Sequence, residues 1–201
     1  MTDTKRSGRP RSFDRDAAVD TAMQLFWRHG YEGVSIGDLT EAIGIAAPSL
    51  YAAFGSKADL FREALVRYDA QLALDERVFE GDASLPRAVR AMLRASARAV
   101  TREENPRGCM VSSGMIACHP DHAQLADELG TRRRALAARL AECLSRWLDA
   151  RQAANVARYL CAVMQGISVQ ARDGASLEEL YAIAELAVQT VPDSPERKSR
   201  R

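Results

Sequence analysis

Two short helices are predicted by the stretch SIGDLTEAIGIAAPSLYAAF, residues 35–54. Ser35 followed three residues later by Asp38 is the capping-box pattern that begins a helix. Gly44 ends this first helix, and Pro48 opens a second, because proline lacks a backbone donor that the first turn of a helix leaves unpaired anyway. Two short helices joined by a glycine turn are typical of a helix-turn-helix unit.

Longer helices are predicted on both sides of this unit. Before it, apolar residues recur at helical spacing up to Gly30. After it, Ser56 with Asp59 repeats the capping pattern and opens a helix that we expect to reach about Phe79. The apolar face of the earlier helix comprises Val19, Ala22, Met23 and Phe26.

The remainder of the chain is also expected to be helical. Sparse proline and glycine separate long apolar stripes, the last two over about 153–172 and 176–191, and no useful strand pattern occurs. We therefore predict an all-α protein of about nine helices, with an N-terminal three-helix helix-turn-helix domain and a C-terminal helical bundle. The expected divisions are a basic arm at 1–12, a DNA-binding domain at 13–58, an effector-binding and dimerisation domain at 59–192 and a basic tail at 193–201.

Composition excludes several classes of protein. The 201 residues are 47% hydrophobic and carry a net charge of +1, so the chain is globular rather than disordered. No apolar run resembles a secretory leader or a membrane span, which predicts a cytoplasmic protein with no membrane partner. The three histidines accompany no nucleophile, phosphate-binding or dinucleotide motif, so we expect neither an enzyme nor a bound cofactor.

Residues 13–65 resemble the DNA-binding head of the TetR/AcrR family of transcriptional regulators. The matching features are Phe26, Gly30 and Tyr31, then Ser35-Ile36, Ala42, Gly44, Leu50-Tyr51-x-x-Phe54, Ser56-Lys57 and Leu60. The resemblance implies a homodimeric regulator that binds a double-stranded DNA operator, with a helical body that binds a small-molecule effector. It also implies repression relieved by that effector.

Eight residues are candidates for DNA contact. Small side chains let a short helix approach base edges, a tyrosine hydroxyl can donate to phosphate, and cations or hydroxyls at helix starts favour phosphate binding. The basic arm can follow the backbone or enter the minor groove. The candidates are Arg9, Arg11, Ser35, Ala47, Pro48, Ser49, Tyr51 and Lys57.

The expected recognition helix, residues 46–54, contains no Arg, Lys, Asn or Gln. It therefore lacks the side chains that make bidentate hydrogen bonds to bases. Base specificity is left to Ser49, to apolar contacts with thymine methyls, to flanking residues or to DNA shape. Apolar residues of the same region are expected in the core of the head, namely Leu39, Ile43, Leu50, Phe54 and Leu60.

The last two helices carry apolar stripes with many small residues, a pattern suited to a four-helix interface with a second copy or to closing the body's own core. We expect a homodimer. The body is expected to sense a small molecule or a thiol-reactive compound; the alternative is a body that recruits a protein partner.

Cys109 is the sharpest effector candidate. Arg107 and the start of a helix expected over 111–117 would both favour its thiolate, although a buried and inert cysteine fits the same pattern. The four cysteines are expected to be free thiols. Cys118, His119 and His122 match no standard zinc spacing, and we predict no metal site. Further candidates for an apolar effector pocket are Met110, Met115, Trp147 and Met164.

Overall fold

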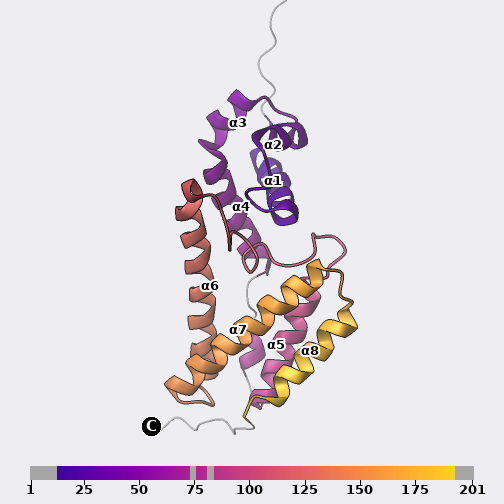
Figure 1. The fold of residues 1–201 in the computed structure, drawn as a ribbon, viewed down its shortest axis with the longest axis vertical. Helices are drawn as coiled ribbons and strands as arrows, with labels where there is room; N and C mark the ends of the chain where they lie inside the picture. The colour runs from indigo at the N-terminus through magenta and orange to yellow at the C-terminus, as the bar shows by residue number, and fades with distance from the viewer. Residues whose placement is uncertain (1–12, 73–75, 81–83, 193–201) are drawn as a thin grey trace, which may run out of the picture.

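The computed structural model describes residues 13–72, 76–80 and 84–192, and every regular element within them is helical (Figure 1). The all-α expectation is confirmed, with eight α-helices and two short 3-10 helices in the described residues. The α-helices are α1 (Arg15–His29), α2 (Ile36–Ile43), α3 (Ala47–Phe54), α4 (Lys57–Leu72), α5 (Leu85–Ala99), α6 (Ala123–Leu144), α7 (Ala150–Arg172) and α8 (Leu177–Gln189); the 3-10 helices are η1 (Glu76–Phe79) and η2 (Pro120–His122). None of these helices is long and apolar enough to cross a bilayer.

The helix-turn-helix forms where its capping signals predict. Ser35 caps α2 by accepting a hydrogen bond from the Asp38 N–H at 3.0 Å, and the Asp38 carboxylate accepts one from the Ser35 N–H at 2.7 Å. Gly44 ends the helix with φ of 77°, a left-handed conformation that suits glycine. Pro48 lies in the first turn of α3, which extends to Phe54.

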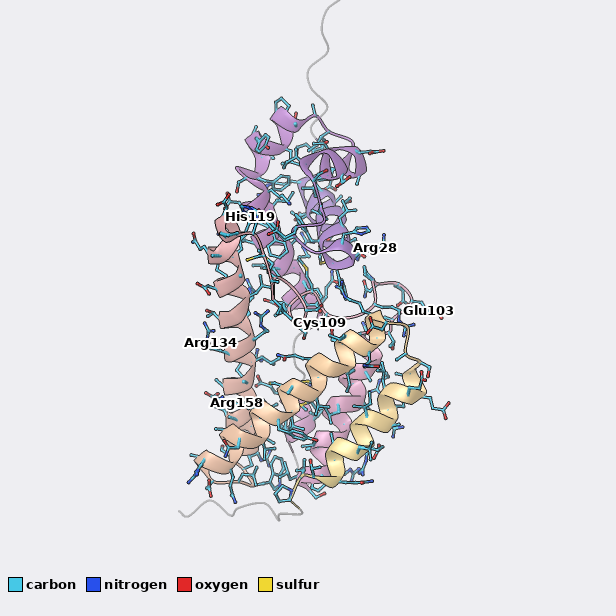
Figure 2. The ribbon with its side chains drawn as sticks, in the orientation of Figure 1. Arg28, Glu103, Cys109, His119, Arg134 and Arg158 are labelled. Atoms are coloured by element: carbon cyan, nitrogen blue, oxygen red, sulfur yellow. The ribbon has the colours of Figure 1, made fainter. Side chains whose placement is uncertain are left out.

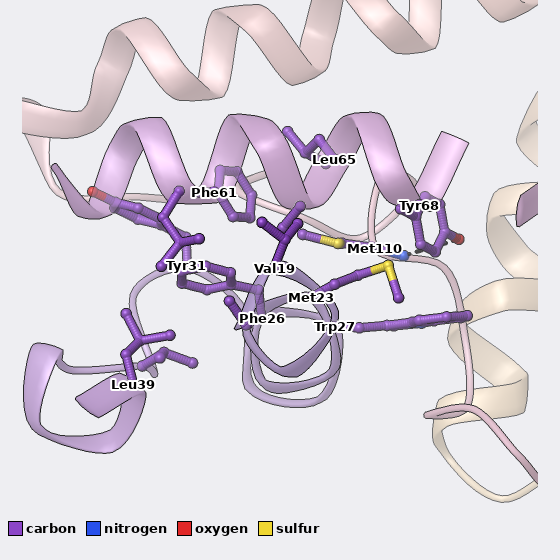
Figure 3. Close-up of a cluster of buried hydrophobic side chains, with 14 of the residues drawn as sticks. Val19, Met23, Phe26, Trp27, Tyr31, Leu39, Phe61, Leu65, Tyr68 and Met110 are labelled. Atoms are coloured by element: carbon purple, nitrogen blue, oxygen red, sulfur yellow. Dashed lines mark hydrogen bonds between the residues drawn. The ribbon is translucent and has the colours of Figure 1, made fainter. Parts of the chain in front are cut away.

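A compact aromatic core holds α1 to α4 together, and these four helices form the head. The Phe61 ring of α4 stacks edge-on against Phe26 at 5.0 Å and Tyr31 at 5.1 Å. The predicted core residues Leu39, Leu50, Phe54 and Leu60 are buried, and Ile43 is half-buried against the same cluster. Figure 3 shows that Met110, from a segment far along the chain, also inserts beside Trp27 and Tyr68.

The body comprises α5, α7 and α8 packed together, with α6 running beside them and on toward the head (Figure 1). The first turns of α6 contribute Leu125 and Leu129 to the core of the head. Its last turns contribute Leu140 and Leu144 to a second core shared with η1, α5, α7 and α8. One helix therefore belongs to both halves of the molecule.

Two predicted helical stretches are wrong. Residues 111–117 form successive turns rather than a helix, and Met115 has a positive φ of 48°. Tertiary contacts account for this, because Arg133 donates hydrogen bonds to the carbonyls of Val111 and Gly114 that a helix would use internally. The helix expected to reach Phe79 does not do so: α4 is described to Leu72, and Glu76–Phe79 forms a separate 3-10 helix, η1.

Candidate nucleic-acid interface and junction thiol

α3 lies at one end of the described part of the molecule (Figure 1), and four of its side chains are exposed. Leu50 and Phe54 anchor the helix in the head, which turns Pro48, Ser49 and Tyr51 toward solvent. Tyr51 is 48% exposed, so its hydroxyl can reach a partner outside the chain. Ala47, at the start of the helix, is half-buried.

Lys57 lies within electrostatic reach of the start of α2, which Ser35 caps. The Lys57 ammonium lies 4.2 Å above the ring of Tyr31, and burial lowers the pKa of Lys57 while the carboxylates of Glu32 and Asp38 act to raise it. Asp38 is also the capping partner of Ser35. A cation and the N-terminus of α2 are thereby brought together, and both favour an anion such as phosphate. Arg9 and Arg11 lie outside the described residues.

The residues considered for an apolar effector pocket do not meet. Met110 and Met115 belong to the core of the head, whereas Trp147 is buried in the core of the body and Met164 packs against that core. A groove of about 400 Å³ lies elsewhere, between α1 and α4. Its lining residues are Asp16, Val19, Arg62, Glu63, Val66, Arg67 and Ala70, none of which is a candidate effector residue.

Cys109 lies at the junction of head and body (Figure 2). Its sulfur accepts a hydrogen bond from the Ser112 N–H at 3.3 Å, and its own N–H donates to Ser168 Oγ on α7 at 2.8 Å. Tyr68 of α4 lies beside the sulfur, and burial together with Cys109 raises the pKa of the Tyr68 hydroxyl. Arg133, on α6, is also close to Cys109: burial lowers the pKa of Arg133, and its interaction with Cys109 acts to raise it. Three helices therefore surround this thiol.

The expectation that Arg107 and a helix start favour the Cys109 thiolate needs correction. Residues 111–117 provide no helix N-terminus. The Arg107 guanidinium donates instead to the carbonyls of Ala171, at 2.8 Å, and Ala175. It thus binds one carbonyl in the last turn of α7 and one in the turn between α7 and α8.

The residue before Cys109 joins α1 to α7. The Trp27 indole N–H donates to the Gly108 carbonyl at 2.9 Å, and Arg172 donates to the Trp27 carbonyl at 2.6 Å. Gly108 has φ of +88°, and a Cβ there would lie 3.0 Å from both the Ser168 carbonyl and the Arg172 side chain. Only glycine fits this backbone and this spacing without strain.

The histidines near Cys118 make contacts of their own. His119 Nδ1 accepts a hydrogen bond from the Asp121 N–H at 3.3 Å, and His122 Nδ1 lies 2.8 Å from the Glu32 carboxylate. The His122 hydrogen bond lowers the pKa of Glu32. Across the described residues, no three His, Cys, Asp or Glu side chains gather in a way that could hold a metal ion.

Sequence reasoning missed the partners of Cys109. Tyr68, Arg133 and Ser168 reach it from three different helices, and no local pattern links them to the Gly-Cys pair. Burial of a tyrosine on α4 is foreseeable from helical spacing, but its neighbour across the fold is not.

A capped helix-turn-helix with an exposed second helix, carried on a helical body, defines a DNA-binding regulator. The model of bacterial regulatory proteins of the tetR family matches residues 18–64. The chain is 38% identical to the HTH-type transcriptional repressor ComR of Escherichia coli (strain K12), over 94% of each chain, and 32% identical to the repressor BdcR of the same organism, over 92% of each. The chain belongs to the TetR family of transcriptional regulators and is not an enzyme.

Solved structures agree with this assignment. A cysteine mutant of the TetR-family regulator CifR, in complex with a 26 bp double-strand operator DNA, superposes with a TM-score of 0.84 and 38% identity. The match covers 92% of this chain and all of that one. The resemblance in fold therefore extends through the body as well as the head.

Proposed function

We propose that this protein is a dimeric transcriptional repressor that binds operator DNA through α3 and leaves it when a thiol-reactive effector modifies Cys109. The exposure of α3 at the end of a capped head is the observation that carries the proposal. The relatives named as repressors and the operator complex of CifR support it. Such binding to chromosomal DNA would take place in the cytoplasm.

DNA contact is assigned to exposed groups around α3. The Tyr51 hydroxyl would donate to a phosphate, and Lys57 with the capped start of α2 would attract a neighbouring phosphate. Ala47, Pro48 and Ser49 would face the major groove, because the first turn of a recognition helix lies closest to the base edges.

Operator binding is tested by fluorescence anisotropy with DNA from upstream of the protein's own gene, against unrelated DNA of equal length at fixed salt. Selective binding is expected, and Tyr51→Phe should weaken it about fivefold, the effect of one hydrogen bond of about 1 kcal/mol. Equal affinity for both DNAs would contradict operator recognition. It would instead favour a body that recruits a protein partner.

Dimerisation is assigned to α7 and α8. Exposed apolar side chains lie on both helices, with Tyr159 at 41% and Leu186 at 64% exposure. On α7, the exposed residues Tyr159, Ala162, Gly166 and Val169 follow one another at the spacing of a helix–helix seam. Two such helices from each copy would form a four-helix interface.

Leu186→Glu tests this interface, because it would bury an unpaired carboxylate between the copies. We expect the dimer dissociation constant, measured by analytical ultracentrifugation, to rise about 100-fold or more. Ile116→Glu is the matched control, since Ile116 is 73% exposed but lies outside α7 and α8. A Leu186→Glu protein as dimeric as the control would place the interface elsewhere.

Effector response is assigned to Cys109 because this half-buried residue has contacts with α4 and α7 at the junction. A thiolate adding to an electrophile such as a maleimide forms a carbon–sulfur bond as the π bond of the ring C=C breaks, and the adjacent ring carbon then takes a proton from water. The adduct would displace the neighbouring Tyr68 or Ser168, and so disturb the segment that holds α1 to α7.

Maleimide treatment followed by mass spectrometry and operator binding tests this assignment. We expect modification of Cys109 to parallel loss of binding, and Cys109→Ser to retain binding after treatment. Cys143→Ser is the control and should remain sensitive, because burial raises the pKa of the Cys143 thiol and keeps it in its less reactive form. Full modification of Cys109 with operator binding intact would exclude the thiol as the sensor.

A further inference from the structure

The outward face of α3 consists almost entirely of carbon. Its exposed residues are Pro48, Ser49, Tyr51 and Ala52, and the only polar side-chain atoms among them are two hydroxyl groups. Leu50 and Phe54 point into the core of the head. No exposed side chain of this helix carries an amide, a guanidinium or an ammonium group.

Pro48 and Ala52 lie on a common face, since residues four apart in a helix are neighbours. Pro48 stands in the first turn, and its ring nitrogen carries no hydrogen to offer a base. Tyr51 is adjacent on the helix and reaches farther, which suits it to a phosphate at the edge of the groove. The centre of the face is therefore the apolar pair.

Two of the three polar side chains of α2, those of Asp38 and Thr40, are engaged within the head, and the third, Glu41, is a carboxylate with no donor to offer. Thr40 donates its hydroxyl to the Gly37 carbonyl at 2.9 Å, and the Asp38 carboxylate accepts from both the N–H and the hydroxyl of Ser35. The first helix of a helix-turn-helix crosses the DNA backbone rather than entering the groove. α2 therefore does not replace the donors that α3 lacks.

Among the four bases, thymine alone marks the major groove with a methyl group, whereas the others are distinguished by hydrogen-bond donors and acceptors. We propose that Pro48 and Ala52 read thymine 5-methyl groups in each operator half-site, and that these contacts determine sequence specificity. The inference rests on the proposed binding of operator DNA by α3. It assigns recognition to the thymine methyl group because α3 has no side chain that can make bidentate hydrogen bonds to a base.

Deoxyuridine tests the proposal, because it pairs like thymidine but lacks the methyl group. The bound site would first be located by footprinting on DNA from upstream of the protein's own gene. Anisotropy would then compare a duplex of that site with the same duplex carrying deoxyuridine for thymidine inside the half-sites. We expect affinity to fall about fourfold for each contacted methyl, the value of burying one such group. Deoxyuridine outside the half-sites should leave affinity unchanged.

Two glycine variants connect the effect to α3. Ala52→Gly removes the Cβ that would contact the methyl, and Ala42→Gly makes the same change at an exposed position of α2. Of these two glycine variants, we expect only Ala52→Gly to bring the ratio of thymidine to deoxyuridine affinity toward unity. Pro48→Ala should also reduce the ratio, and alanine is well tolerated in a helix. Because the readout is a ratio, a general loss of stability does not imitate it.

The outcomes separate the two proposals. Selective binding with equal affinity for thymidine and deoxyuridine half-sites would overturn methyl readout while leaving operator binding intact. A ratio unchanged in both Ala52→Gly and Pro48→Ala would also overturn the assignment to α3. Absence of selective binding to either duplex would contradict the proposed function itself.

Discussion

Because glycine has no side chain, the backbone at Gly108 can lie against α7. The φ of +88° at Gly108 is a conformation that other residues rarely adopt, and a Cβ added there would lie only 3.0 Å from the Ser168 carbonyl. The same residue accepts the hydrogen bond of the Trp27 indole, so its position affects the end of α1.

Gly108→Ala is therefore expected to lower the free energy of unfolding by about 1–3 kcal/mol, the typical cost of a strained backbone residue. Urea unfolding followed by circular dichroism measures this change. Gly37→Ala is the control, because Gly37 lies within α2 and the nearest neighbour of its added Cβ would be Ser35 Oγ at 3.4 Å. We expect the control to be neutral or stabilising, and an equal midpoint for both variants would contradict this account.

At the scale of the element, local signals accounted for the helix starts. Ser35 with Asp38 and Ser176 with Glu179 form capping boxes, and the pattern at 35–38 is readable from the sequence. The turns at 111–117 were not foreseeable in the same way. Their carbonyls are satisfied by Arg133 of α6, a partner that no local pattern identifies.

The cap of α2 makes the head sensitive to acid. Hydrogen bonds from Ser35 lower the pKa of Asp38 below its value in the unfolded chain. The contribution of this carboxylate to stability is thus present above the unfolded pKa and is lost as pH falls through the folded pKa.

Asp38→Asn should reduce this dependence on pH. We expect the loss of unfolding free energy between about pH 5 and about pH 3 to be smaller in Asp38→Asn than in the unaltered protein. Urea titrations at the two pH values provide the measurement. Asp127→Asn, at an exposed carboxylate of α6, is the comparison. If both variants reduce the pH dependence of the unfolding free energy equally, the cap of α2 is not the source of that dependence.

At the scale of the whole molecule, α6 holds the head to the body through charge as well as packing. Arg62 of α4 donates to both carboxylate oxygens of Glu128, with Nε and Nη2 contacts of 2.9 and 2.8 Å. Glu32 adds a second link through His122. Contacts of this kind join residues more than sixty positions apart, which is why the sequence predicts the helices but not how they meet.

Glu128→Gln should loosen this connection without unfolding the head. We expect amide hydrogen exchange in the first turns of α6 to accelerate about fivefold, as the loss of about 1 kcal/mol from a bidentate pair implies. Glu63→Gln breaks the Arg15–Glu63 ion pair inside the head and is the matched control. If both variants exchange alike in α6, the Arg62–Glu128 pair does not restrain that helix.

The presence of Met110, Met115, Leu125 and Leu129 in the core of the head has a consequence for engineering. A chimera joined just after α4 would separate α1 and α4 from side chains that complete their interior. The transplanted half would expose apolar surface, and the corresponding side chains kept by the recipient would face a head that they do not match. A hybrid regulator with a new operator preference should therefore exchange only the outward residues of α3, or carry residues 105–130 along with the graft.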